Sequence, residues 1–492
     1  MTKKKVLIIG AGFSGLAAAS VLAQDGFDVT VLEKNSMPGG RARKFSENGF
    51  TFDMGPSWYW MPDVFEKFFA IFGKTPQDYY KLQRLDPSYR FYFGKDEIVD
   101  VPANFAEVVD IFEKEEAGAG VALAKFLAEA EYKYKVAMSR FVYKPGLSMF
   151  EFARPELLAS AFRLDMFSSF DKHLKQYFKS PRLRQMLEFP ILFLGGTAKN
   201  TPALYSLMNY GDIKLGTWYP VGGMYSVVEG MVELAVSLGV KLIYNCPVEK
   251  LEVSGANITS VIAAGEKFEA PYILASADYH YVEQHLIPDE YKSYTERYWE
   301  SRVLSPSSLL FFLGIDIKLE GMEHHTLFFD QDLNKHSEAI YENPGWPEKP
   351  SLYFSCTSKT DNTVAPEGME NLFVLIPVAP GLEDTDETRE KYFRIILDRF
   401  KELTGQDISE NVVFKRSYAH RDFENDYNAF KGNAYGLANT LMQTAFLKPK
   451  MRSKKVKNLF YAGQLTAPGP GVPPALISGE MAARLIMKDA RG

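Results

Sequence analysis

The chain has 492 residues and a formal net charge of −6 at pH 7. This length allows a large core and two or more domains. The small negative charge gives no indication of a nucleic-acid partner or of an electrostatic membrane patch. The only cysteines, Cys246 and Cys356, have neither disulfide nor metal-binding spacing, which favours a reducing compartment.

The N-terminal segment combines three lysines with an apolar run, a pattern that secretory signals share. A glycine motif lies inside this run, so cleavage would destroy it, and we interpret the segment as part of the mature fold. No apolar stretch approaches the ~20 residues of a membrane-spanning helix. If the protein contacts a membrane, we expect it to lie on the surface.

The first motif is a strand, a glycine turn and a helix. An apolar strand over residues 3–9 leads into a G-x-G-x-x-G turn at residues 10–15, and a small-residue helix follows. In such a turn Gly10 makes the tight bend, Gly12 lets a pyrophosphate approach the backbone and Gly15 lets helix and strand pack closely. The phosphates then lie at the helix N-terminus, where free N–H groups favour anions.

A second apolar strand at residues 28–32 ends in Glu33, 18 residues after the last glycine of the turn (33 − 15 = 18). An acid at this place can accept hydrogen bonds from the adenosine ribose hydroxyls and argues against a 2′-phosphate. Strand, turn, helix and acid together predict a bound dinucleotide. A second turn, with Gly39, Gly40 and Arg41, follows, and it resembles the extended fingerprint of the flavin amine oxidase and carotenoid desaturase superfamily, whose cofactor is FAD.

The rest of the chain alternates between strand and helix patterns. The aromatic segment 58–72 has helical spacing in its second half and is interpreted as core. Residues 105–185 are predicted to be mostly helical, with a break at 144–146, and further helices are expected before Leu238 and at 387–403. A short alternating strand that closes in a Gly-Pro turn is expected over residues 49–57. Further strands are expected at residues 89–93, 98–101, 241–244, 248–253, 258–262, 272–275, 309–315, 352–357, 372–378 and 412–418.

One segment, residues 186–196, is unusually apolar for its place between helix patterns. It is equally compatible with a helix and loop packed in the core and with a surface that faces lipid or lines a channel.

The end of the chain is again specific. Residues 458–463 are a predicted strand ending in glycine, residues 468–474 a rigid proline-glycine turn, and residues 475–487 a helix. A helix N-terminus aimed at the pyrimidine edge of a flavin would stabilise its anionic reduced form. The two ends of the chain are therefore expected to build one cofactor site.

Over its full length the chain resembles the bacterial-type phytoene desaturases, the carotenoid desaturase branch of the FAD-dependent oxidoreductases. The resemblance rests on residues 10–15 with Glu33, 38–41, 50–56, 218–223 and 458–471. In the closing signature of that family, Gly463 would be followed by two small residues and a Thr-His-Pro-Gly-x-Gly sequence. This chain lacks the small pair and the histidine, which leaves open whether it acts on phytoene or on a later carotenoid with a ring or hydroxyl at one end.

The resemblance implies an α/β fold, in which a Rossmann-like FAD-binding domain of the GR2 type joins a mixed-sheet substrate domain and a helical subdomain that faces a membrane. The expected FAD-binding domain comprises residues 1–75, 215–300 and 420–492, the substrate domain 76–140 and 301–419, and the helical subdomain 141–214. The residues implied to bind FAD are Gly10, Gly12, Phe13, Ser14, Gly15, Glu33, Lys34, Gly39, Gly40, Arg41, Gly55, Pro56, Ser57, Val248, Ala275, Asp278, Gly463, Gly471, Val472 and Pro473.

The implied reaction is the desaturation of a carotenoid, in which a hydride passes to flavin N5 and a base or water takes the neighbouring proton. It needs no metal. Glu151 and Arg154 stand where the family has its proposed catalytic acid-x-x-arginine sequence, although this i, i+3 spacing is also typical of a solvated surface pair. The expected partners are the carotenoid, the inner face of the cytoplasmic membrane as a peripheral attachment, and quinone or oxygen as electron acceptor, with no nucleic acid.

Three other functions stay open at this stage. A flavin amine oxidase would share the glycine turns, although no cysteine lies near Gly463 to tether the flavin. A carotenoid isomerase of the same superfamily could use reduced FAD without net redox change. An isoprenoid-binding escort protein of the GDP-dissociation-inhibitor type resembles this fold, but the intact fingerprint with Glu33 argues against it.

Overall fold

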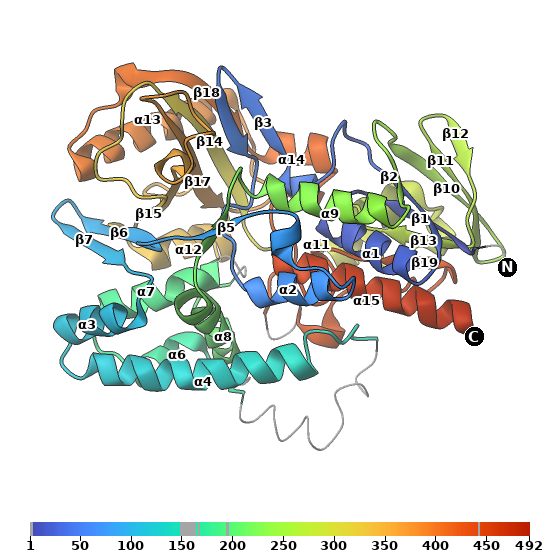
Figure 1. The fold of residues 1–492 in the computed structure, drawn as a ribbon, viewed down its shortest axis with the longest axis horizontal. Coiled ribbons are helices and arrows are strands. Elements are labelled where there is room, and N and C mark those ends of the chain that lie inside the picture. The colour runs from blue at the N-terminus through green and yellow to red at the C-terminus, as the bar shows by residue number, and fades with distance from the viewer. Residues whose placement is uncertain (1–2, 148–163, 166–167, 193–195, 441–442) are drawn as a thin grey trace.

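The structure, a computed structural model, describes residues 3–147, 164–165, 168–192, 196–440 and 443–492. Two large sheets lie side by side, and a layer of helices lies beneath the second of them (Figure 1). The two chain ends lie close together at the far side of the first sheet (Figure 1). Both sheets contain segments from distant parts of the sequence.

The first sheet is parallel and has the strand order β19-β13-β1-β2-β9. Its apolar sequences are buried on both faces, as is typical of a parallel sheet covered by helices. The strands are β1 (Lys5–Ile9), β2 (Asp28–Leu32), β9 (Lys241–Ile243), β13 (Tyr272–Ala275) and β19 (Leu459–Tyr461).

Helix α1 (Phe13–Gln24) lies between α9 (Tyr225–Ser237) and α15 (Val472–Arg491) against this sheet (Figure 1). The contact between α1 and α15 is close because Gly479 has no side chain. A Cβ atom at Gly479 would lie 2.2 Å from the carbonyl oxygen of Ser14. The N-terminal and C-terminal helices therefore pack backbone to backbone at the start of α1.

The second sheet is mixed and has the strand order β18-β14-β17-β16-β15-β6-β7, with one parallel pair, β15 with β6. Side chains alternate between its faces, so Leu309 packs toward α13 while Leu310 faces the interior between the sheets. The strands are β6 (Tyr89–Gly94), β7 (Glu97–Val101), β14 (Ser307–Ile315), β15 (His325–Phe328), β16 (Leu352–Ser355), β17 (Glu370–Val378) and β18 (Val412–Tyr418).

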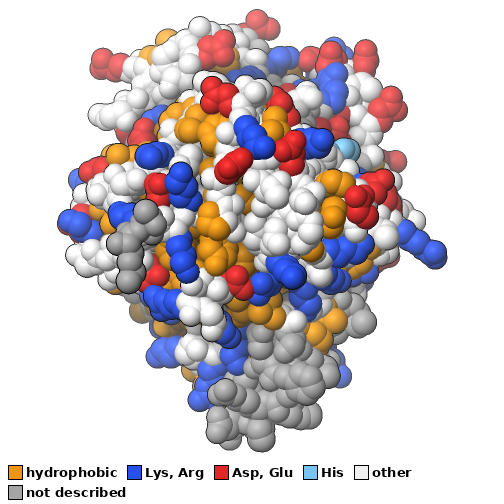
Figure 2. All heavy atoms as spheres, turned by 90° about the vertical axis from the view of Figure 1, so that its right-hand side faces the viewer, with side chains coloured by type: hydrophobic (Ala, Val, Ile, Leu, Met, Phe, Trp, Pro, Cys, Tyr) orange, Lys and Arg blue, Asp and Glu red, His pale blue; other side chains and the backbone are white. Residues whose placement is uncertain are grey.

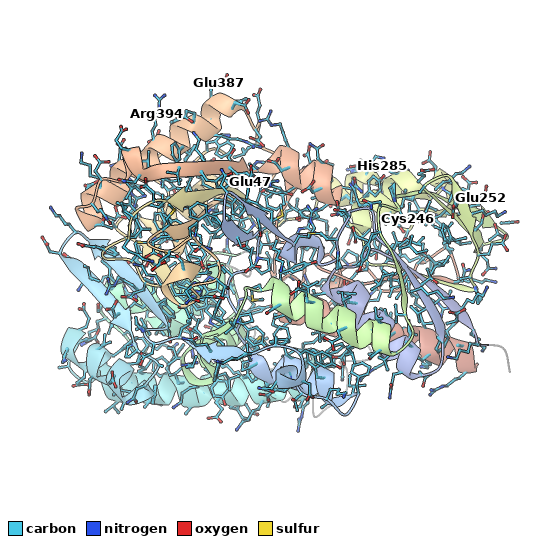
Figure 3. All side chains as sticks on the ribbon, turned by 45° about the horizontal axis from the view of Figure 1, so that its top comes forward. Glu47, Cys246, Glu252, His285, Glu387 and Arg394 are labelled. Atoms are coloured by element: carbon cyan, nitrogen blue, oxygen red, sulfur yellow. The ribbon has the colours of Figure 1, made fainter. Side chains whose placement is uncertain are left out.

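Helix α13 (Asp386–Thr404) covers the outer face of this sheet with one apolar side. Phe400 and Ile396 are fully buried against the sheet, whereas Glu387 and Arg394 point outward at the edge of the molecule (Figure 3). This arrangement is that of an amphipathic helix and confirms the helix predicted at 387–403.

A helical layer lies below the second sheet (Figure 1). It contains α3 (Phe105–Glu115), α4 (Ala119–Arg140), α6 (Phe170–Leu174), α7 (Pro181–Leu192) and α8 (Leu207–Asn209). Among the described residues, no helix is long and apolar enough to cross a membrane.

The apolar segment that was equally compatible with core and lipid contact belongs to α7 where it is described. Phe189 is 0% and Ile191 1% exposed, and the Phe189 ring contacts those of Trp58, Tyr89 and Phe91. The described part of this segment is therefore core and offers no surface to a lipid.

Shorter elements connect these layers. They include the hairpin β3 (Lys44–Glu47) and β4 (Phe50–Asp53), the antiparallel trio β10 (Val248–Ser254), β11 (Asn257–Ala263) and β12 (Glu266–Phe268), the pair β5 (Leu82–Arg84) and β8 (Trp218–Pro220), and the helices α2 (Pro62–Ala70), α10 (Tyr279–Tyr281), α11 (Glu296–Glu300), α12 (Leu333–Tyr341) and α14 (His420–Tyr427).

The strands of the parallel sheet all fall within residues 1–75, 215–300 and 420–492, and those of the mixed sheet within 76–140 and 301–419. Helices α3 and α4, which the expected division joins to the mixed sheet, pack with α8 in the helical layer. The three-domain division itself stays a prediction.

The packing of α15 on α1 gives a testable prediction. We expect Gly479→Ala to lower the free energy of unfolding by about 1–3 kcal/mol, because the new methyl group overlaps the Ser14 carbonyl and overpacks the contact. Thermal or denaturant unfolding measures the change. Lys488→Ala, at an exposed position of the same helix, is the matched control, and equal stability of the two variants would contradict the prediction.

Candidate cofactor site

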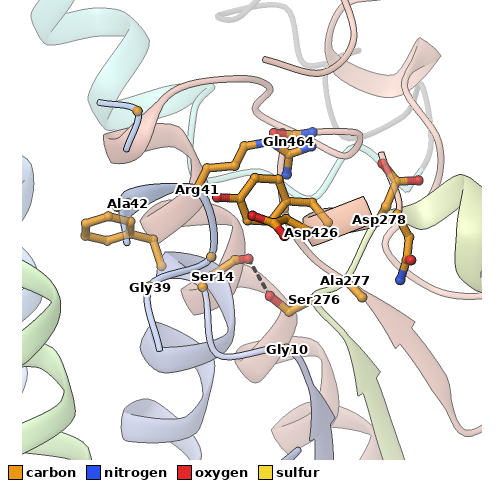
Figure 4. A pocket seen from close by; sticks show the side chains of 18 of the residues that line it. Gly10, Ser14, Gly39, Arg41, Ala42, Ser276, Ala277, Asp278, Asp426 and Gln464 are labelled. Atoms are coloured by element: carbon orange, nitrogen blue, oxygen red, sulfur yellow. Dashed lines mark hydrogen bonds between the residues drawn. The ribbon is translucent and has the colours of Figure 1, made fainter. Parts of the chain in front are cut away.

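A cavity of about 350 Å³ lies between the parallel sheet and the inner face of the mixed sheet. Figure 4 shows it from close by, with the turn at Gly10 and Ser14 on one side and Asp278 on another. Its walls come from both ends of the chain and from strands β14 and β17 between them. The volume lies in the usual range for small-molecule and cofactor pockets.

The turn after β1 forms one wall, and its glycines have the predicted geometry. Gly10 has a φ of +100°, and a Cβ atom at Gly15 would lie 2.0 Å from the Gly10 carbonyl oxygen. At Gly12, by contrast, a Cβ atom would meet no atom within 4 Å, because this residue borders the cavity. The second glycine turn is tied to the first, since Gly39 donates its N–H to Ala11 at 2.8 Å.

Glu33 follows β2 and is 5% exposed. Its Oε2 accepts the N–H of Ala11 at 2.8 Å, and its Oε1 accepts both the backbone and the side-chain N–H of Asn35 at 2.9 and 3.0 Å. A carboxylate has about four acceptor positions, so the side chain retains capacity for a further donor such as a sugar hydroxyl. These contacts hold the acid in place at the cavity wall.

Two ionisable side chains border the cavity with unsatisfied atoms. Asp278 is 7% exposed and uses Oδ1 to accept the N–H of Tyr281 at 3.1 Å. Its Oδ2 and the Nε of Arg41 have no hydrogen-bond partner in the described part of the chain. Burial lowers the pKa of Arg41 and raises that of Asp278. Buried polar atoms are normally paired, so their presence here fits a cavity that takes a polar ligand.

Hydrogen bonds join the chain ends around the cavity. Ser14 and Ser276 are 2.7 Å apart through their hydroxyl oxygens, which links the start of α1 to the end of β13 (Figure 4). Gly463, after β19, donates its N–H to the hydroxyl of Ser478 in α15 at 3.0 Å. The N-termini of α1 and α15 thus border the same cavity, so the two ends of the chain meet at one place.

The structure brings most of the sequence-predicted cofactor residues to this cavity. They are Gly10, Gly12, Phe13, Ser14, Glu33, Lys34, Gly39, Gly40, Arg41, Gly55, Pro56, Val248, Asp278, Gly463, Gly471 and Val472. Their individual contacts with a cofactor stay predictions.

Four predicted cofactor residues do not line the cavity. Gly15 lies beneath Gly10, and Ala275 is fully buried within β13. Ser57 instead makes a 2.8 Å hydrogen bond to the hydroxyl of Tyr353, in the mixed sheet. Pro473 lies in the first turn of α15, between Val472 and Ala475, which do line the cavity. The predicted catalytic pair, Glu151 and Arg154, lies outside the described residues.

Sequence reasoning missed the contributions of helix α14 and of the mixed sheet. Tyr427 of α14 lies under the guanidinium groups of both Arg41 and Arg43, at 5.1 and 5.2 Å, and Asp426 forms an ion pair with Arg43. From the sheet, Leu310 and Leu375 reach the cavity. The alternation of side chains along β14 and β17 assigns each residue to one of two sheet faces, but it does not show which face borders the cavity.

A second, smaller cavity of about 40 Å³ adjoins the first, and Leu375 and Tyr435 border both. Its lining is mainly apolar, from Phe189, Leu327, Phe329, Leu333, Ile340 and Leu352 among others. It extends the space beside the mixed sheet toward helix α12.

One group of side chains has the composition of a metal site. Glu129, Asp165 and His173 place one ligand atom each within 4.8 Å of one another. The ammonium of Lys133 already occupies this group, 2.9 Å from an Asp165 oxygen and 3.4 Å from His173 Nε2. A cation would compete with this lysine, so we interpret the group as an ion-pair cluster.

Comparison with known proteins agrees with this geometry. The model of the flavin containing amine oxidoreductase family matches residues 13–487. The chain is 41% identical over 490 residues to a carotenoid 3,4-desaturase of Haloarcula japonica, covering 99% of both chains. It is 31% identical over 492 residues to a zeta-carotene-forming phytoene desaturase of Myxococcus xanthus, covering 98% of this chain and 94% of the relative.

Among solved structures, an oxidoreductase from Methanosarcina mazei superposes with a TM-score of 0.62 at 16% identity, covering 98% of this chain and 100% of that one. At this identity the likeness shows the fold alone. The family model and the full-length relatives go further, and the chain therefore belongs to the flavin containing amine oxidoreductase family, among the carotenoid and phytoene desaturases, with FAD as its cofactor.

Proposed function

We propose that this protein is an FAD-dependent carotenoid desaturase that introduces carbon–carbon double bonds into a long polyene. The full-length likeness to two desaturases carries the proposal. The apolar cavity that adjoins the cofactor cavity supports it, because a carotenoid chain needs a dry, apolar surface beside the flavin.

The residues present fit FAD. The backbone of Gly10 and Gly12 at the N-terminus of α1 would hold the pyrophosphate, and Glu33 the ribose hydroxyls. The start of α15, at Gly471 and Val472, would face the flavin ring. When bound, FAD supplies the acceptor for the hydride that leaves the substrate.

The chain's own contribution to the reaction is positioning and the exclusion of water. Leu310, Leu375 and Phe189 give the two cavities apolar walls that hold a polyene in place. His325 is 0% exposed, and its Nδ1 lies 2.8 Å from the hydroxyl of Tyr353, which borders the second cavity. Burial keeps the pKa of His325 well below its ordinary value. We further propose Glu151 as the group that takes the substrate proton, with Arg154 holding its carboxylate.

As the substrate we propose a later carotenoid rather than phytoene. Of the two desaturases compared above, the one with the higher identity to this chain is a carotenoid 3,4-desaturase. In the second cavity, the hydroxyl groups of Tyr341 and Ser351 have no hydrogen-bond partner within the described chain. An end group that carries a hydroxyl would satisfy them, whereas the all-hydrocarbon end of phytoene would leave them unpaired.

We propose peripheral attachment to the inner face of the cytoplasmic membrane as the route by which the substrate arrives. On the face seen in Figure 2, Lys and Arg side chains gather on the lower half, while Asp and Glu are more frequent near the top. A basic region of this kind can bind anionic lipids even when the net charge of the chain is −6. The proposed electron acceptor is a membrane quinone or oxygen.

Replacing the acid after β2 tests the cofactor site. We expect Glu33→Gln to weaken FAD binding at least about tenfold, about 1.4 kcal/mol, because the amide loses acceptor positions and turns N–H groups toward the ribose and Ala11. Fluorescence titration of the apoprotein with FAD measures this. Glu47→Gln, at an exposed position in β3, is the control, and unchanged affinity in Glu33→Gln would contradict the assignment.

Product analysis tests the activity. Purified protein with FAD is given phytoene, neurosporene, lycopene or γ-carotene in liposomes, each with and without a hydroxylated end group. We expect a red-shifted product, separated by chromatography, with preference for a hydroxylated substrate. An unshifted product of altered geometry would indicate an isomerase, and peroxide formed from added primary amines would indicate an amine oxidase.

Vesicle flotation tests the attachment. We expect the protein to float with vesicles containing anionic lipid, to float less with neutral vesicles, and to be released as salt rises from about 0.1 to 1 M. Failure to bind either vesicle, together with acceptance of carotenoid from detergent alone, would contradict membrane attachment.

A further inference from the structure

A lysine that no function yet uses is buried beside the cofactor cavity. Lys448 is 3% exposed, and its ammonium group has no hydrogen-bond partner in the part of the chain that the structure describes. Near it, Asn439 is 5% exposed, and its Oδ1 is also unpartnered there. A buried donor and a buried acceptor are thus both unsatisfied in one place.

Both atoms converge on Gly469. A Cβ atom at this glycine would lie 2.9 Å from Asn439 Oδ1 and 3.2 Å from Lys448 Nζ. Gly469 lies two residues before Gly471, which is the N-cap of α15 and borders the cofactor cavity. Lys448 does not line the cavity itself, but its ammonium packs against the turn that leads into the N-terminus of the helix.

The N-terminus of α15 has no side-chain cap, and no acidic residue lies in its first turn. Its free N–H groups carry a partial positive charge toward the cavity. When it is protonated, Lys448 adds a positive charge next to Gly469, in the turn that leads into this helix. An ammonium buried without a counterion is strongly unfavourable, and burial lowers the pKa of Lys448 to about 7. A negative charge in the cavity would offset this cost.

We propose that Lys448, which lies near Asn439, is a positioning residue whose ammonium acts with the N-terminus of α15 to favour the negatively charged, reduced form of FAD. In a low-dielectric interior such an attraction is only weakly screened. The proposal rests on FAD being the cofactor and does not depend on which carotenoid is desaturated.

The test is the midpoint potential of the bound flavin, measured by reductive titration against a reference dye in the absence of carotenoid. We expect Lys448→Met to lower the equilibrium constant for flavin reduction at least tenfold, which for a two-electron couple is a shift of about 30 mV to more negative potential. Lys448→Arg keeps the charge and should restore most of the wild-type value. Lys457→Met, at an exposed position, is the control and should leave the potential unchanged.

A second variant tests the same charge by changing the neighbouring residue, Asn439. Asn439→Asp leaves the lysine in place but provides a counterion, so it should shift the potential in the same direction as Lys448→Met. Lys448→Met removes the unpaired buried charge and Asn439→Asp pairs it, so we expect neither variant to lower the melting temperature. An unchanged potential in both variants, with FAD bound, would overturn the proposal. Loss of FAD or of stability in both would also overturn it, because the pair would then serve the fold rather than the flavin.

Discussion

The cofactor site depends on the close approach of two backbones, that of the turn after β1 and that of helix α15. Gly15 brings the start of α1 against Gly10, and Gly479 brings α15 against Ser14. Because neither contact has room for a side chain, the two helices begin at the same cavity and direct two N-termini into it. Glu33 and the turn at Gly39, Gly40 and Arg41 border the same cavity.

Much of the fold could be predicted from local pattern. The glycine turn, the strands β1, β2, β14, β17 and β18 and helix α13 appear where periodicity and turn residues indicate them. Strands β5, β8 and β12 have three residues each, too few to show an alternating pattern. Strand β15 begins with a histidine, and the sequence does not indicate that tertiary packing buries it. Helix α15 begins at Val472, earlier than expected, because its two prolines fit the first turn.

The site residues that lie at a fixed sequence spacing from one another could be predicted, whereas those brought to the cavity by tertiary packing could not. Glu33 and the two glycine turns have a fixed spacing from β1, so the sequence indicates them. Tyr427 and Leu375 reach the cavity only through the packing of other elements, and nothing local indicates their role. The segment around Phe189 shows the same limit, since apolar composition alone does not distinguish core from lipid contact.

The strand order of the parallel sheet also determines when the site can form during synthesis. Strand β1 emerges from the ribosome first and is central, yet its partner β13 comes about halfway along the chain and β19 follows only at Leu459. Helix α15, which completes the cavity, ends one residue before the C-terminus. The nascent chain can pair β1 with β2 early, but the other edge of β1 stays unpaired until β13 has been synthesised. The cavity is complete only once α15 has been made, so FAD binding belongs to a late step of folding.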